Sequence, residues 1–220
     1  MRSRITVFGG TFDPIHNGHL IVARDIAEAR RLDRITLMPA GVPPHKAASQ
    51  TAGEHRLAMC QRVADRDPLF DVSDLELGRE GRSYTIDTVD ALRERGCDVT
   101  LIIGTDMLEY LPHWHRSDEL LGRASFLVAA RPPLDERVDE IFRKLENVFA
   151  PHVVGRLRES IVETSRIEIS STQIRERRSA GKPISYLTPE CVVDYIAENG
   201  LYAGNGPQSG SGETGKNILK

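Results

Sequence analysis

Short apolar runs alternate along this chain with longer segments in which apolar residues recur every three or four positions. The apolar runs predict buried strands, and the longer segments predict amphipathic helices. Strands are expected at residues 5–8, 34–39, 70–77, 99–103, 125–130 and 167–169. Helices are expected at residues 18–31, 53–67, 83–96, 117–121, 137–146, 170–181 and 188–200. The alternation predicts an α/β fold with a doubly wound parallel sheet.

Glycine and proline mark several of the expected helix ends. Gly96, Gly181 and Gly200 stand where helical periodicity stops, and glycine adopts the left-handed conformation of a helix C-terminus without steric cost. Thr188 followed by Pro189 predicts the start of the last helix, because proline suits the first helical position.

The pattern divides the chain into three parts. Residues 1–165 hold the α/β core, and residues 166–202 form a C-terminal helical segment. Residues 203–220 are rich in Gly, Ser and Asn and have no apolar periodicity, so a disordered tail is expected there.

Composition narrows the class of protein. With 220 residues, 40% of them hydrophobic, the chain suits one domain with a sizeable core. The net charge of -3 gives no general attraction to nucleic acid or anionic membranes, and no apolar run approaches the ~20 residues that span a bilayer. The three cysteines are far apart and form no CxxC pair, which predicts free thiols. A soluble cytoplasmic protein is expected, and self-association is left open.

Polar segments directly follow several of the expected strands. An α/β sheet binds its ligands at the carboxyl ends of its strands, so these segments stand where a ligand is expected. They read GGTFDPIHNGH, GVPPHK, GTD, ARPP and ISSTQIR, and they are far apart in the sequence. Because parallel strands end at one edge of the sheet, these segments are expected to meet there.

The first of these segments combines a glycine turn with two histidines. Gly9 and Gly10 permit close backbone approach, and Thr11 and Phe12 add N–H donors. The following helix points its positive end at the same place. His16 and His19 are three residues apart and share one helix face, which predicts binding of a phosphate chain.

A structural role or a metal site would account for the two histidines less well than phosphate binding does. One ring could cap the helix while the other packs in the core. A metal site lacks a third ligand, and neither GxGxxG nor GxxxxGK[ST] is present.

The segment ISSTQIR predicts a second anion site. Ser170, Ser171 and Thr172 suit a helix N-terminus, whose hydroxyl and N–H groups bind anions. Arg175 lies in the same turn and can bind phosphate oxygens with its guanidinium. The alternative is an ordinary capped helix with a solvated arginine.

Two further residues follow strands. Lys46, in GVPPHK, is a mobile cation suited to phosphate, although the segment could be a plain surface loop. Asp106, in GTD, suits a ribose hydroxyl or a Mg²⁺-bound water, and it could instead cap the next helix.

These motifs resemble those of a known superfamily. GGTFDPIHNGHL is similar to the (T/H)xGH motif of the nucleotidyltransferases, and ISSTQIR matches their ISSTxIR motif in full. SYTIDT, GTD, the nearby Trp114, an RP pair and the ending PECVVDYI…GLY resemble the bacterial nicotinate-mononucleotide adenylyltransferases. The resemblance covers about residues 4–202 and is weakest over residues 132–165.

The resemblance implies a Rossmann-like nucleotidyltransferase fold and transfer of the adenylyl group of ATP to nicotinate mononucleotide, without a covalent enzyme intermediate. Mg²⁺ would arrive with ATP. His16 and His19 would stabilise the α- and β-phosphates, and Lys46 would attract the attacking phosphate. The remaining implied contacts are to ATP, by Gly9, Gly10, Thr11, Phe12, Asp106, Ser171, Thr172 and Arg175, and to the pyridine ring, by Thr85 and Trp114.

Two alternatives to this function stay open from the sequence. The acceptor could be another phosphorylated compound, such as nicotinamide mononucleotide or phosphopantetheine. The chain could also be a nucleotide-binding module that has lost turnover.

Overall fold

A computed structural model describes residues 2–41, 51–79, 81–130 and 136–204. Lys46 and residues 205–220 of the expected tail lie outside the described residues.

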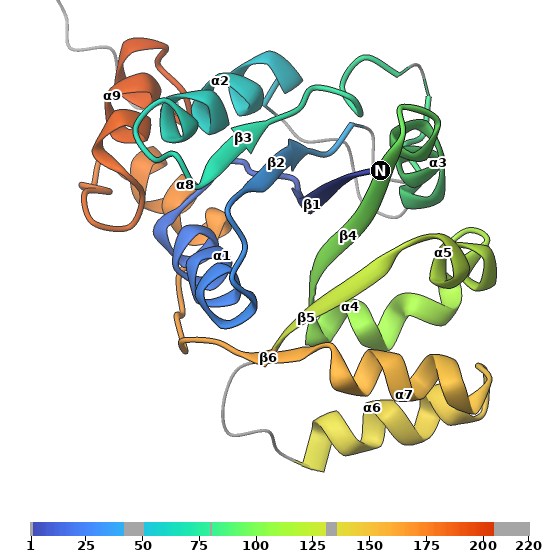
Figure 1. The fold of residues 1–220 in the computed structure, drawn as a ribbon. Coiled ribbons are helices and arrows are strands. Elements are labelled where there is room, and N and C mark those ends of the chain that lie inside the picture. The colour runs from blue at the N-terminus through green and yellow to red at the C-terminus, as the bar shows by residue number, and fades with distance from the viewer. Residues whose placement is uncertain (1, 42–50, 80, 131–135, 205–220) are drawn as a thin grey trace, which may run out of the picture.

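The strands form one parallel sheet, as the sequence predicts (Figure 1). In spatial order they are β3 (Phe70–Val72), β2 (Ile35–Pro39), β1 (Ser3–Gly10), β4 (Cys97–Gly104), β5 (Ser125–Ala130) and β6 (Ile161–Glu163). β1 pairs with both β2 and β4, and Phe8 lies opposite Leu37 on one side and Ile102 on the other. The chain order reverses between β1 and β4, which is where doubly wound folds bind their ligands.

Helices cover both faces of the sheet (Figure 1). One face packs against α1 (Asn17–Arg30), α2 (Gly53–Ala64), α8 (Ser171–Ser179) and α9 (Glu190–Glu198). The other packs against α3 (Thr85–Glu94), α4 (Thr105–Tyr110), the 3-10 turn η1 (Leu111–His113), α5 (Ser117–Arg123), α6 (Glu136–Glu146) and α7 (Pro151–Glu159).

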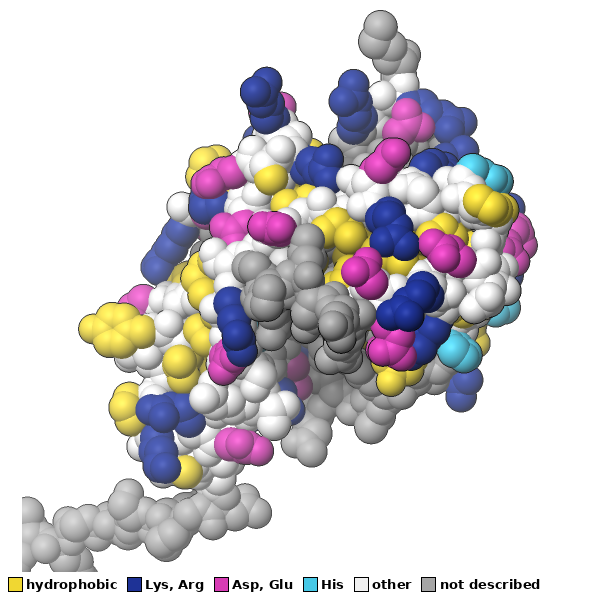
Figure 2. Space-filling view, turned by 90° about the horizontal axis from the view of Figure 1, so that it is seen from below, with side chains coloured by type: hydrophobic (Ala, Val, Ile, Leu, Met, Phe, Trp, Pro, Cys, Tyr) yellow, Lys and Arg dark blue, Asp and Glu magenta, His cyan; other side chains and the backbone are white. Residues whose placement is uncertain are grey.

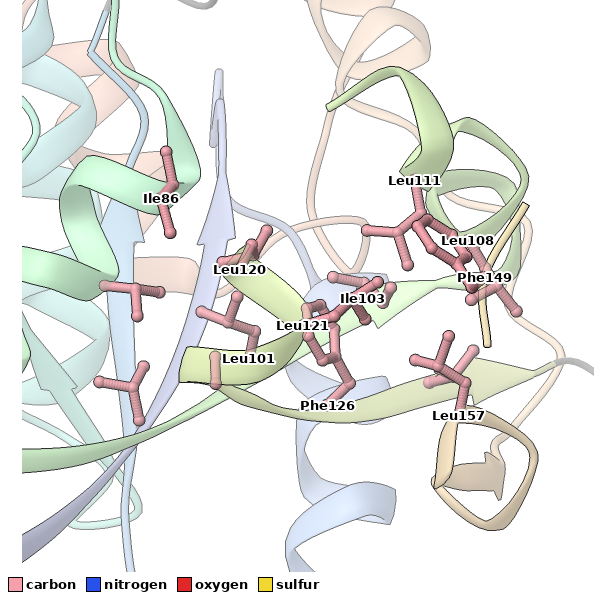
Figure 3. Close-up of a cluster of buried hydrophobic side chains, with 14 of the residues drawn as sticks. Ile86, Leu101, Ile103, Leu108, Leu111, Leu120, Leu121, Phe126, Phe149 and Leu157 are labelled. Atoms are coloured by element: carbon pink, nitrogen blue, oxygen red, sulfur yellow. The ribbon is translucent and has the colours of Figure 1, made fainter. Parts of the chain in front are cut away.

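Strand residues alternate between the two hydrophobic layers. In β4, Leu101 and Ile103 face the layer of α3 to α7, whereas Ile102 faces the layer of α1, α2, α8 and α9. Figure 3 shows Leu101 and Ile103 beside Leu121 of α5, in the first of these layers. Burial on both faces explains why VTLII is continuously apolar in the sequence.

The last strand lies elsewhere than the sequence predicts. Residues 167–169 form no strand, and Ile161–Glu163 occupies the edge of the sheet instead. Val162 supplies the buried side chain of this strand and pairs with Ala129 of β5. A three-residue edge strand with one buried position has too little periodicity to be recognised in the sequence.

Smaller differences concern short elements. α4, η1 and α7 were not predicted, and the third strand ends at Val72 instead of residue 77. The last helix starts at Glu190, with Pro189 as its N-cap residue. Gly96, Gly181 and Gly200 have φ values of 82°, 66° and 60°, which confirms their predicted role at helix ends.

The surface carries charges of both signs. Arg158 of α7 pairs with Asp139 and Glu146 of α6, and Figure 2 shows blue and magenta side chains interspersed over one face. The three cysteines are free, as predicted. No helix in the described ranges is both long and apolar enough to cross a bilayer.

Candidate active site

The segment that joins β1 to α1 lies at the switch point of the sheet. Gly9 and Gly10 end β1 opposite Met38 and Pro39 of β2. On its other side β1 pairs with β4, which ends at Gly104. The phosphate-binding segment predicted from the sequence, residues 9–19, therefore follows the central strand at the edge where such sheets bind ligands.

Phe12 shapes this segment through its side chain as well as its backbone. Its φ of 49° turns the chain, and its ring is 1% exposed. A Cβ on Gly10 would lie 2.8 Å from the Phe12 ring, so only glycine leaves the ring its place. The ring meets His19 edge to face, with centroids 5.1 Å apart.

His16 and His19 fix one another through the backbone. His16 is the N-cap of α1, and its Nδ1 accepts the N–H of His19 at 3.3 Å. In return, Nδ1 of His19 accepts the N–H of His16 at 3.2 Å. The rings stack with centroids 3.6 Å apart. Because both Nδ1 atoms accept, each neutral ring carries its proton on Nε2 and can donate there.

Burial keeps this pair uncharged. Removal from water lowers the pKa of His16 from 6.5 to about 4, although its own backbone hydrogen bond opposes the shift. The pKa of His19 lies well below 6.5, first because of burial and second because of the charge that His16 would carry beside it. At neutral pH the site therefore offers two neutral N–H donors.

The C-terminal motif reaches the same segment from more than 150 residues away. The hydroxyl of Ser171 donates to the carbonyl of Pro14 at 2.8 Å. Nη1 of Arg175 donates to the carbonyl of Asp13 at 2.7 Å, and its Nη2 donates to Oγ1 of Thr172 at 3.2 Å. The structure thus brings both predicted motifs together.

At the start of α8, main-chain N–H groups rather than serine hydroxyls are the groups suited to an anion. Ser170 is the N-cap, and its hydroxyl accepts the N–H of Gln173. The Ser171 hydroxyl is engaged with Pro14, so its side chain stabilises the β1–α1 segment in this state. The first N–H groups of a helix have no partner within the helix, and they remain suited to an anion.

Three residues that the sequence pattern did not indicate as site residues complete the surroundings. Tyr202 donates its hydroxyl to Oδ1 of Asp13 at 2.6 Å, and Asp13 is 5% exposed. Arg56 is 4% exposed and donates to the main-chain carbonyls of Thr11, which follows β1, and Ala40, which follows β2. Arg56 shares a helix face with Met59, Cys60 and Val63, and a charge on that apolar stripe was the available signal.

The residues expected at the acceptor lie on the α3 side of the sheet. Thr85 is the first residue of α3, and this helix start has no side-chain cap. The neighbouring Tyr84 ring lies 4.4 Å from that of His115, next to Trp114. Trp114 is partly buried against the hydrophobic layer of α3 to α7. Within the part of the chain that the structure describes, no hydrogen bond or ring contact joins Thr85 or Trp114 to residues 9–19.

Asp106 stands at the end of β4, in the first turn of α4, and is exposed. Its Oδ1 would be 2.5 Å from a Cβ on Gly104, so glycine leaves room for the carboxylate above the strand end. Within the described residues, no three His, Cys, Asp or Glu side chains form a cluster that could hold a metal ion.

Comparison with known proteins defines the class first. A family model described as cytidylyltransferase-like matches residues 7–177, which include both motifs and most of the sheet. This match, together with the fold and the site, defines a nucleotidyltransferase.

Curated relatives narrow the class further. The nicotinate-nucleotide adenylyltransferase of Bacillus subtilis is 40% identical, over 90% of this chain and 98% of the relative. A probable enzyme of that name from Pectobacterium atrosepticum is 42% identical, over 92% of this chain and all of the relative. The chain belongs to the nicotinate-nucleotide adenylyltransferase family.

Solved structures agree on the fold. The Plasmodium falciparum nicotinic acid mononucleotide adenylyltransferase complexed with NaAD has a TM-score of 0.68 and 18% identity, covering 91% of this chain and 97% of that chain. The same enzyme complexed with APC gives a TM-score of 0.66. At this identity the likeness concerns the fold alone.

Proposed function

We propose that this chain transfers the adenylyl group of ATP to nicotinate mononucleotide, giving nicotinate adenine dinucleotide and pyrophosphate in NAD biosynthesis. Membership of the nicotinate-nucleotide adenylyltransferase family supports the reaction. The observation that carries the chemistry is the reciprocal capping of His16 and His19, which leaves two neutral Nε2–H donors beside the start of α8.

The reaction needs charge stabilisation more than covalent chemistry. A phosphate oxygen of the mononucleotide attacks the α-phosphorus of ATP, and the bond from that phosphorus to the oxygen bridging to the β-phosphate breaks in line. Negative charge grows on the α- and β-phosphate oxygens. His16 and His19 donate to these oxygens, and their fixed rings need no reorientation as the charge develops. Gly9, Gly10, Thr11 and Phe12 provide main-chain contacts to ATP.

The β- and γ-phosphates are assigned to the start of α8. Its N–H groups and helix dipole favour negative charge, and Thr172 adds a hydroxyl. Arg175 has five N–H groups, more than the two that its bonds to Asp13 and Thr172 use, so it can bind phosphate while it still holds the Asp13 carbonyl.

The acceptor is assigned to the other side of the switch point. Trp114 would stack on the pyridine ring, and Thr85 would line the ring's pocket. The uncapped start of α3 at Thr85 favours a ring carboxylate, because a helix N-terminus attracts negative charge. This favours the acid mononucleotide over the amide. Lys46 would attract the attacking phosphate.

Magnesium is proposed to arrive as part of the ATP complex. Mg²⁺ is commonly bound through one or two carboxylates together with substrate phosphates. Asp106 offers one exposed carboxylate at the end of β4, suited to a Mg²⁺-bound water or to the ribose. A cytoplasmic location and self-association stay predictions.

The test is a pyrophosphate-release assay with ATP and three acceptors: nicotinate mononucleotide, nicotinamide mononucleotide and phosphopantetheine. We expect kcat/KM to be highest for nicotinate mononucleotide. A preference for either other acceptor would contradict the proposed substrate, and ATP binding without pyrophosphate release from any acceptor would indicate a module without turnover.

The acceptor pocket is tested with Trp114→Ala. Loss of stacking should raise KM for nicotinate mononucleotide at least about tenfold and leave KM for ATP nearly unchanged, since one aromatic pair contributes about 1 kcal/mol beyond its buried area. KM for both substrates is measured on the same preparation, so ATP serves as the internal control. Equal changes in the two KM values would remove Trp114 from the pocket.

A further inference from the structure

Arg56 of α2 joins three segments of backbone through one guanidinium. Its Nη1 donates to the carbonyl of Thr11 at 2.8 Å and to that of Ala40 at 2.8 Å. Its Nε donates to the carbonyl of Thr51 at 3.3 Å. Thr11 belongs to the segment that carries the two histidines, Ala40 follows β2, and Thr51 precedes α2.

We propose that Arg56 is a positioning residue for adenylyl transfer, which holds the β1–α1 segment against the end of β2. The inference rests on the proposed function for its reaction. Arg56 is 4% exposed, and these three hydrogen bonds all go to main-chain carbonyls of its own chain. It therefore acts on the substrates through Thr11 and the residues that follow it.

Nearby groups compensate the buried charge. Burial lowers the pKa of Arg56, and the Asp13 carboxylate is the largest influence that opposes this shift. Asp13 in turn accepts the Tyr202 hydroxyl. A buried cation with three acceptors and an acidic neighbour is tolerated, whereas an incomplete arrangement would be costly.

The same segment is held at successive residues. Arg56 binds it at Thr11, Arg175 at Asp13 and Ser171 at Pro14. Arg56 also bonds to the β2 side, at Ala40, whose N–H donates to the carbonyl of Gly10. Without Arg56, the segment would keep its bonds to α8 but lose this cross-link, so its position relative to β2 would become less defined.

Arginine suits this role because its planar group presents several N–H donors in fixed directions. Lysine keeps the charge but has a compact ammonium that cannot reproduce this geometry. Arg56→Lys therefore separates positioning from charge. Arg62 is the matched control, because it lies on the same helix but forms an exposed ion pair with Glu198.

The experiment measures kcat, both KM values and the binding of α,β-methylene-ATP by calorimetry. We expect Arg56→Lys to lower kcat roughly 10- to 100-fold, since small misplacement of reacting groups has effects of this size. The analogue should bind more weakly but with unchanged stoichiometry, which shows that all molecules remain folded. Arg62→Lys should stay within about twofold of wild type, as for other exposed pairs.

Two results would overturn the proposal. The first is that kcat and both KM values of Arg56→Lys stay within about twofold of the wild-type values. The other is a loss of activity that matches an equal loss of analogue-binding stoichiometry, because a purely structural role predicts fewer active molecules with normal kinetics. A wild-type protein inactive on nicotinate mononucleotide would refute the proposed function, whereas the analogue's affinity would still test Arg56.

A second variant covers failure of Arg56→Lys to fold. Arg56→Gln is assayed at low temperature with and without added guanidinium chloride at millimolar concentration. Partial recovery of kcat with guanidinium, and none with equal ammonium chloride, would support the proposal. Equal activity with both salts would overturn it.

Discussion

Two hydrogen bonds hold His16 and His19 as neutral donors, because both bonds engage the Nδ1 atom of a ring and leave its proton on Nε2. Each Nδ1 accepts a main-chain N–H, so protonation of either ring at Nδ1 would place two hydrogens against each other. The rings also stack, which makes a second charge unfavourable. Capping and the proposed catalytic role are thus compatible: Nδ1 caps the helix, and Nε2 is the atom that would donate to the phosphates in the proposed mechanism.

His19→Ala should lower kcat by two or more orders of magnitude, because one preorganised donor to developing charge is lost. Steady-state pyrophosphate release measures this, with thermal unfolding to verify the fold. His152→Ala, which removes an exposed imidazole on α7, is the control and should leave kcat unchanged. Near-normal turnover of His19→Ala would refute the assigned mechanism.

Burial of His16 also predicts a pH dependence of stability. Its folded pKa of about 4 lies below the ordinary 6.5, so the unfolded state binds a proton first as the pH falls. The contribution of neutral His16 to the free energy of unfolding is complete above about pH 6.5. It is lost as the pH falls towards 4, by roughly 3 kcal/mol for a shift of this size.

Urea unfolding between pH 4 and 7 measures this dependence. His16→Asn keeps an N-cap acceptor but does not titrate, so its free energy of unfolding should fall less than that of wild type over this range. His152→Asn changes an exposed ring and should keep the wild-type dependence. An unchanged dependence in His16→Asn would show that His16 is not the responsible group.

The β1–α1 segment is ordered by side chains as much as by its glycines. Gly10 leaves space for the Phe12 ring, Phe12 meets His19 edge to face, and Phe8 lies 5.8 Å from Phe12. The aromatic contacts of Phe8 and Phe12 fix the orientation of the His19 ring. A change at Gly10 should therefore reach His19 through Phe12.

Gly10→Ala should lower the free energy of unfolding by about 1–3 kcal/mol, as overpacking does, because the new Cβ would meet the Phe12 ring. Thermal and urea unfolding measure this. Gly9→Ala is the matched control, since a Cβ there has no neighbour within 4 Å among the described residues. Equal destabilisation by the two substitutions would show that general glycine effects, rather than the Phe12 contact, are responsible.

Across the whole molecule, the C-terminal segment completes the N-terminal site. Besides the bonds of α8, Thr188 donates to the carbonyl of Ile15, and the side chain of Asn17 donates to that of Tyr186. Tyr202 reaches Asp13 across 189 residues. The site therefore depends on the docking of α8, α9 and the residues that follow.

Tyr202→Phe should destabilise the protein by about 1–3 kcal/mol, because the buried Asp13 carboxylate loses a donor. Tyr186→Phe is the matched control, since its side chain is 92% exposed, and it should change stability by less than ~0.5 kcal/mol. Both are measured by urea unfolding at neutral pH. Equal stability of Tyr202→Phe and wild type would show that the hydroxyl is not needed.

The periodicity of apolar residues and the positions of turn residues were sufficient to predict the class of fold from the sequence. The apolar runs, the alternation with helices and the closing glycines placed five of the six described strands, because strand burial on both faces and glycine's left-handed conformation are local properties. The two motifs also indicated phosphate binding from local chemistry alone, a glycine turn before a helix and hydroxyls at a helix start.

Tertiary structure decided what depends on distant groups. The proton position on His16 and His19 follows from reciprocal bonds that a spacing of three does not reveal. The role of Arg56 follows from three carbonyls that meet only in the folded chain. The edge strand Ile161–Glu163 is set by pairing with β5. Local sequence determines element types and candidate chemistry, whereas burial and long-range hydrogen bonds determine protonation and position.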